Sequence, residues 1–208
     1  MARFPASALV LPFAAMLWAQ QPASPSSRPP DQAKSQARSA VPEAGAISAG
    51  VYHNSAFGFS YKLPYGWVDR TPDMQDASAE AAKSRVLLAI FERPPQAAGD
   101  SINSAVVIAA EALSAGAKTA AEYFDTLTAV SIGKGLKTDG DPHEFSVGTT
   151  RLVRGDFSKA RGTLTMRQTS LVWLQKGYAV SFTFIGGSED EVNELIEKLS
   201  FAARKPGH

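Results

Sequence analysis

The sequence contains no cysteine. This absence excludes disulfide bonds, zinc sites with thiolate ligands and catalysis by a cysteine nucleophile. It also leaves no residue to carry the lipid of a lipoprotein. Because no covalent crosslink is available, the apolar core must hold the folded state together.

Histidine is scarce and the net charge is small. The three histidines, His53, His143 and His208, are too few and too dispersed to predict a catalytic triad or a three-histidine zinc site. The formal net charge is +1 and the pI is near 8.0, which does not indicate the concentrated basic face that phosphate-backbone binding requires. We therefore expect no nucleic-acid partner.

The N-terminal apolar run is too short to span a bilayer, which requires about 20 consecutive apolar residues. It extends from Ala6 to Ala19, follows a single positive charge at Arg3, is interrupted by Pro12 and ends at the polar Gln20. This pattern is typical of a secretory signal peptide, which we place at residues 1–19. We therefore expect an exported protein, periplasmic or extracellular, with no integral membrane span after cleavage.

Residues 20–50 are rich in Pro, Ser, Ala and Gln, and their only large apolar side chains are Val41 and Ile47. So little apolar surface cannot offset the entropy lost when a segment becomes ordered. The sequence therefore predicts a disordered tether over residues 20–50, one folded domain over residues 51–204 and a short tail over residues 205–208.

Two segments alternate large apolar residues with small or polar ones, which predicts strands with one apolar face. The large residues are Phe57, Phe59, Tyr61 and Leu63 in the first segment, and Tyr178, Val180, Phe182 and Phe184 in the second. Further strands are expected over residues 85–92, 104–112, 144–157 in two pieces, and 164–175. Lys176 and Gly177 should join the last two strands as a hairpin.

Capping-box patterns predict two helices. Thr119 and Glu122 begin one that should run to Gly133, and Ser188 and Glu191 begin the other. The second carries an apolar stripe of Val192, Leu195, Ile196 and Leu199. We therefore expect an α+β fold in which an antiparallel-rich sheet is covered by amphipathic helices, with the aromatic strand faces buried beneath those helices.

The order of these elements resembles a known family. The segment FGFSYKLPYGW from Phe57, the mid-chain helix, the long hairpin and the final SEDEVNELIEKLSF resemble the PsbP-like and DcrB-like superfamily of α/β/α sandwich proteins. The resemblance covers most of residues 51–201 and rests on this pattern, not on a catalytic motif. It implies a non-enzymatic, extrinsic protein of an exported compartment that binds larger complexes. Unlike DcrB-type lipoproteins, the chain has no lipid-bearing cysteine.

Motifs for chemistry are incomplete. The segment from Gly58 to Lys62 lacks the second glycine of a nucleophile elbow, and the segment from Ile132 to Gly135 lacks most of a phosphate-binding loop. The segment from Asp139 to Glu144 gathers carboxylates and an imidazole that could hold a metal, but its spacing favours a solvated turn. We therefore expect no catalytic, cofactor-binding or metal-binding residues and no enzymatic activity.

Five basic residues are concentrated on adjoining expected strands. They are Arg151, Arg154, Lys159, Arg161 and Arg167. Basic residues at such positions can serve only to keep a sheet edge soluble. The alternative interpretation, which makes them candidate partner-binding residues, is contact with an acidic protein or an anionic head group.

Three functions remain open. The first is an exported binding or assembly module that docks on an envelope protein complex through a sheet edge or the basic hairpin, without a cofactor. The second is a carrier of a small apolar ligand in a pocket between sheet and helix, lined by Trp67, Phe182 or Phe184. The third is a metal-dependent hydrolase that uses Asp139, Asp141 and His143. The oligomeric state is left open, with a monomer as the simplest case.

Overall fold

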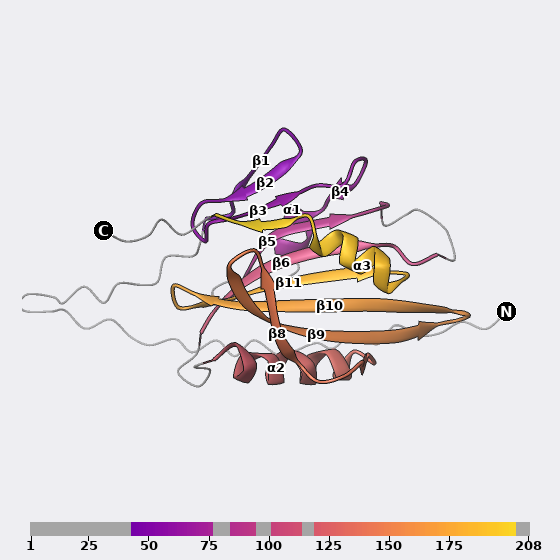
Figure 1. The fold of residues 1–208 in the computed structure, drawn as a ribbon. Coiled ribbons are helices and arrows are strands. Elements are labelled where there is room, and N and C mark those ends of the chain that lie inside the picture. The colour runs from indigo at the N-terminus through magenta and orange to yellow at the C-terminus, as the bar shows by residue number, and fades with distance from the viewer. Residues whose placement is uncertain (1–42, 77–83, 95–100, 114–118, 203–208) are drawn as a thin grey trace, which may run out of the picture. The chain divides into compact units, whose positions relative to one another are not determined.

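The computed structural model describes residues 43–76, 84–94, 101–113 and 119–202, all within one unit that spans residues 39–208. The predicted signal peptide, the C-terminal tail and most of the predicted tether lie outside the described residues. Two sheets and three helices form three layers. The smaller sheet and one helix lie on one side of the larger sheet, and another helix lies on its opposite side (Figure 1).

The larger sheet is antiparallel throughout. In spatial order its strands are β4 (Val68–Asp69), β5 (Ser84–Phe91), β6 (Ala105–Ala112), β11 (Tyr178–Gly186), β10 (Leu164–Gln175), β9 (Thr150–Arg161) and β7 (Lys137–Thr138), with β8 (His143–Val147) also paired to β9. Lys176 and Gly177, with φ of 52° and 80°, form the two-residue turn between β10 and β11. The predicted hairpin is therefore confirmed, since two positive φ angles give the turn that matches strand twist.

The smaller sheet has the order β1 (Ala46–Ser48), β2 (Val51–Asn54), β3 (Phe59–Lys62) and β12 (Leu199–Phe201). Strand β1 lies inside the segment predicted to be a disordered tether, so the first pairing between strands begins before residue 51. A turn at Ala49 and Gly50, both with positive φ, folds β1 onto β2. Backbone pairing orders this stretch although it offers almost no apolar surface, which composition alone could not show.

Three helices accompany the sheets: α1 (Thr71–Asp76), α2 (Ala120–Gly133) and α3 (Glu189–Ile196). The predicted capping box of α2 is present, because the Thr119 hydroxyl accepts from the Glu122 amide and the Glu122 carboxylate accepts from the Thr119 amide. Helix α3 ends at Ile196, so Leu199, which the apolar stripe assigned to the helix, instead begins β12 and is buried there.

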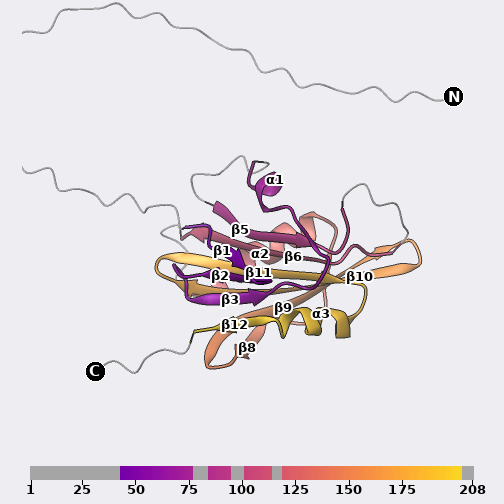
Figure 2. The same ribbon diagram turned by 90° about the horizontal axis from the view of Figure 1, so that it is seen from above.

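The smaller sheet and α3 cover one face of the larger sheet, which we call the closed face (Figures 1 and 2). Aromatic rings from both sheets interlock there. Phe59 of β3 lies edge-on to Phe182 of β11, with ring centroids 5.1 Å apart. Trp173 of β10 meets Phe201 of β12 at 5.0 Å. These edge-to-face contacts are the favoured geometry for aromatic pairs.

The covering layer differs from the sequence prediction. The α+β architecture with an antiparallel sheet is confirmed, but the aromatic face of β11 lies mainly beneath a second sheet. The period-two pattern shows that a strand has one apolar face and does not show what covers it. In this fold the aromatic strand β3 and the aromatic strand β11 bury each other.

The opposite face of the larger sheet carries α2, and we call it the open face. Phe124 of α2 is fully buried and stacks on Phe157 of β9, with centroids 6.2 Å apart and an interplanar angle of 5°. A Cβ atom at Gly155 would overlap the Phe124 ring. Glycine at this position therefore allows α2 to approach β9 closely.

Candidate functional site

The five basic residues predicted to contact a partner do not share a face. Side chains alternate along a strand, and β9 and β10 pair in a fixed antiparallel register. This register places Arg154 and Arg167 on the closed face. It places Arg151, Lys159 and Arg161 on the open face. The sequence therefore located two sets of basic residues, not one patch.

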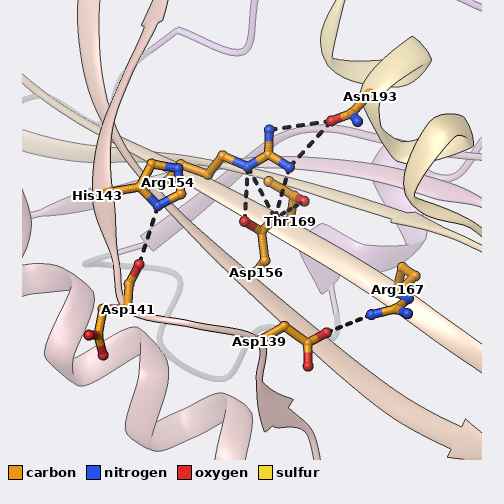
Figure 3. Close-up of polar contacts among 8 residues, drawn as sticks. All are labelled: Asp139, Asp141, His143, Arg154, Asp156, Arg167, Thr169 and Asn193. Carbon is orange, nitrogen blue, oxygen red and sulfur yellow. Dashed lines mark hydrogen bonds and ion pairs between the residues drawn. The ribbon is translucent and has the colours of Figure 1, made fainter.

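The Arg154 side chain is hydrogen-bonded to neighbouring residues of the protein (Figure 3). Its Nε donates to both carboxylate oxygens of Asp156, at 3.1 and 3.0 Å, and its two terminal nitrogens donate to the Asn193 side chain of α3, each at 3.3 Å. The guanidinium also lies over the Phe145 ring of β8, and the Thr169 hydroxyl donates to Asp156. With its side chain only 12% exposed, Arg154 joins strands to α3 and is poorly placed to meet a partner.

Arg167 is also paired. Its guanidinium donates to the Asp139 carboxylate at 2.9 Å, and the Ser158 hydroxyl donates to the other oxygen of the same carboxylate at 2.9 Å. A small cavity of about 130 Å³ is lined by Arg167 and Asp139, by neighbouring residues of β9 and β10, and by Glu189 and Val192 of α3. Arg167, 44% exposed, is more accessible than Arg154, but its charge is already matched.

The segment from Asp139 to Glu144 does not converge on a metal-binding geometry. Asp139 turns toward Arg167, and the His143 ring Nδ1 lies 3.2 Å from the Asp141 carbonyl oxygen rather than near its carboxylate. Within the described part of the chain, no three potential ligands come together as a metal site. The residues proposed for a hydrolase are therefore dispersed in this structure (Figure 3).

A groove of about 400 Å³ lies on the open face, beside α2. Helix α2 packs over β9, β10 and β7, so β6 and β11 are left partly uncovered by the described elements. We call this the α2 groove. Its apolar lining is Met74, Val107, Leu127, Val130, Leu136 and Ile185. Its floor also carries the hydroxyl groups of Ser170 and Thr183.

The two ends of the α2 groove differ in charge. Toward the start of the helix, the Tyr123 hydroxyl donates to the Glu111 carboxylate at 2.7 Å. Burial raises the pKa of Tyr123, and the hydrogen bond to Glu111 raises it further, so this hydroxyl stays protonated. Toward the end of the helix, Lys134 lines the groove. The groove thus combines an apolar wall with polar groups at both ends.

The pocket residues named from the sequence are not in this groove. Phe182 and Phe184 are fully buried on the closed face, and Trp67 packs against the same core. The α2 groove lies on the opposite side of β11 from these residues. Sequence reasoning missed it because large aromatic residues fill a closed core, whereas the groove is lined by smaller side chains.

The edge of the larger sheet at β5 is covered. The Thr71 hydroxyl and the Gln75 side-chain carbonyl accept from the backbone amides of Ala89 and Val86, each at 2.9 Å. Helix α1 thus satisfies strand amides that a docking strand would need. Among the residues that the structure describes, no helix is long and apolar enough to cross a membrane.

No family model matches the sequence, and no curated protein matches it. Among solved structures, the chain is similar to the cyanobacterial PsbP protein CyanoP from Synechocystis sp. PCC 6803, with a TM-score of 0.48 and 12% identity over 76% of this chain and 96% of that one. It is also similar to a Bacteroides thetaiotaomicron protein, with a TM-score of 0.41 and 16% identity over 72% of this chain and 46% of that one.

A protein of unknown function from Pseudomonas aeruginosa is similar too, with a TM-score of 0.38 and 12% identity over 71% of this chain and 92% of that one. The chain thus spans less than half of the Bacteroides protein. A cyanobacterial PsbP protein, of the family that the sequence resembles, is thus among the solved structures similar to this chain. These likenesses concern the fold alone.

Proposed function

We propose that this protein is an exported, non-enzymatic binding protein that carries a small, mainly apolar ligand in the α2 groove. The observation that carries this proposal is the groove itself. Its volume of about 400 Å³ lies within the roughly 300–1,000 Å³ typical of ligand pockets. An apolar lining with a few polar groups at defined points is also the usual composition of such pockets.

Binding is favoured over catalysis by the chemistry of the groove. Within the described residues of its lining, the one hydrogen-bonded titratable pair is Tyr123 with Glu111. The raised pKa of Tyr123 keeps it neutral, so it is a poor general base at neutral pH. The hydroxyl group of Thr183, which is partly exposed, can instead accept a hydrogen bond from a bound molecule or donate one to it.

The test is binding of the neutral fluorophore 1-aminoanthracene to the purified mature chain, combined with native mass measurement for co-purifying molecules. Leu127→Trp should fill the groove and weaken binding by about tenfold or more, because it removes the space that the probe occupies. Ile132→Trp is the matched control, since Ile132 lies on α2 outside the lining and is 54% exposed. Equal affinity in both variants would disprove the proposal.

Docking on an envelope protein complex is a second candidate, favoured by the end of the β9–β10 hairpin. Strand β11 pairs with β10 only from Arg167 onward, and β7 pairs with β9 only as far as Ser158. The remaining residues extend beyond their neighbouring strands and carry the exposed Arg161 and the 38% exposed Leu164. Crosslinked capture from the cell envelope should lose its partner in Arg161→Glu and retain it in Lys62→Glu if this candidate holds.

A further inference from the structure

We infer that the ligand of the α2 groove is an anionic amphiphile, whose acidic head group lies at the C-terminal end of α2 and whose apolar chain runs along the helix. This inference rests on the proposed function and adds the chemical class and orientation of the ligand.

Two cations, Lys134 and Lys159, lie together at the C-terminal end of α2, and Arg161 lies further along β9; we call the three the basic end. The Lys159 ammonium donates to the Lys134 carbonyl oxygen at 2.6 Å, which brings β9 against the last turn of the helix. Arg161 follows two residues later on the same side of β9. Lys134 itself lines the groove.

The described residues supply no carboxylate to two of the three cations of the basic end. Carbonyl groups at a helix C-terminus carry partial negative charge, and Lys159 already offsets this charge by its hydrogen bond. Among the residues that the structure describes, the Lys134 ammonium and the Arg161 guanidinium have no acidic partner. The nearby Asp139 is occupied by Arg167 and Ser158 on the other face. Among the described residues, Lys134 is therefore the cation of the groove lining that is available to an anion.

The apolar part of the groove leads away from the basic end. Leu136 and Val130 lie near Lys134 in the chain, and Leu127 continues the lining toward Tyr123. Residues 123 to 134 of a helix span about 16 Å at 1.5 Å per residue. A medium-length alkyl chain fits such a path, with its far end near the Tyr123–Glu111 pair.

The opposite charges at the two ends set the orientation. An acidic head group at the Glu111 end would face a carboxylate, and a cationic head group at the basic end would face like charges. A neutral apolar molecule would leave the basic end unused. An acid with an alkyl tail fits both ends of the groove. Its carboxylate meets the cations of the basic end, and its uncharged tail stops short of Glu111.

The experiment compares decanoic acid with 1-decanol, which has the same chain and no charge, as competitors of 1-aminoanthracene. Decanoic acid should compete at least about tenfold better, since only its carboxylate can form charge-assisted hydrogen bonds with the basic end. Lys134→Gln should reduce the affinity for decanoic acid toward that for decanol and leave the affinity for decanol unchanged. Lys137→Gln is the matched control, because Lys137 lies in β7 and does not line the groove.

Salt gives an independent readout. Rising ionic strength should weaken the binding of decanoic acid but not that of decanol, because salt screens only the charged head group. Equal competition by both compounds, with no effect of Lys134→Gln, would overturn the inference while the carrier proposal stands. If neither compound competes and Leu127→Trp leaves the affinity for the fluorophore unchanged, the carrier proposal itself fails.

Discussion

The two faces of the larger sheet are built from the same strands but differ in burial. The closed face is covered, and the open face is partly exposed. On the closed face, rings from the smaller sheet interlock with those of β11, and Phe182 and Phe184 have no exposed surface. On the open face, the alternate residues Thr183 and Ile185 remain partly exposed beside α2. The closed face therefore stabilises the fold, whereas the open face has space for a bound molecule.

The largest expected difference in stability is between substitutions of two adjacent residues on β11. Phe184→Ala removes a fully buried ring from the closed face and should lower the free energy of unfolding by about 3–5 kcal/mol. Ile185→Ala removes a half-buried side chain from the groove and should lower it by about 1 kcal/mol, because little cavity forms. Urea denaturation of both variants measures the difference. Similar losses would show that the open face is as tightly packed as the closed one.

A second comparison uses two arginines of β9. Arg154→Ala should lower the free energy of unfolding by about 2 kcal/mol, because Asp156 and Asn193 lose a charged hydrogen-bond partner where water has little access. Arg161→Ala should change it by less than about 0.5 kcal/mol, since this side chain is exposed. Thermal unfolding of the two variants distinguishes the structural arginine from the one available for binding. A stability loss in Arg161→Ala would mean that it has a structural role.

A smaller effect should appear at alkaline pH. Tyr61 is buried on the closed face, where its hydroxyl donates to the Leu195 carbonyl oxygen, and burial raises its pKa well above the ordinary value of 10.0. The folded state therefore keeps this proton when the unfolded state has lost it. Stability from Tyr61 is complete below pH 10 and falls above it, by about 1.4 kcal/mol per pH unit.

Tyr61→Phe provides the control for this pH dependence. The variant should be less stable at pH 8, because the Leu195 carbonyl loses its donor, but its stability should fall less steeply between pH 10 and 11. Denaturation midpoints across that range supply the slopes. Parallel slopes for the two proteins would contradict the assignment of the effect to Tyr61.

Local patterns predicted the parts of the fold that depend on local physics. The Lys176–Gly177 turn and the Thr119 cap follow from residue types that favour one backbone geometry, and both were predicted correctly. Strand β1 could not be predicted, because its order comes from pairing with β2 rather than from its own side chains. Leu199 fits a helical stripe and a strand equally well, and the pairing of β12 with β3 decides between them.

The candidate site was less predictable than the fold. Alternation along β9 could have placed Arg154 opposite Arg151 and Arg161 from the sequence alone. The α2 groove could not be derived in this way, since it depends on where α2 lies across the sheet. One partial signal was present: Val130 and Ile132 are apolar yet each more than half exposed, so α2 carries more apolar residues than one sheet face requires.

The contact between Phe124 and Gly155 fixes how α2 sits on the sheet, because no larger residue at position 155 would leave room for the ring. The wall of the groove is thus held in place before any molecule enters it. A rigid wall of this kind spares a ligand the entropy of ordering its own site. Gly155→Ala would displace α2, and we expect bound molecules to leave such a protein sooner while arriving at much the same rate.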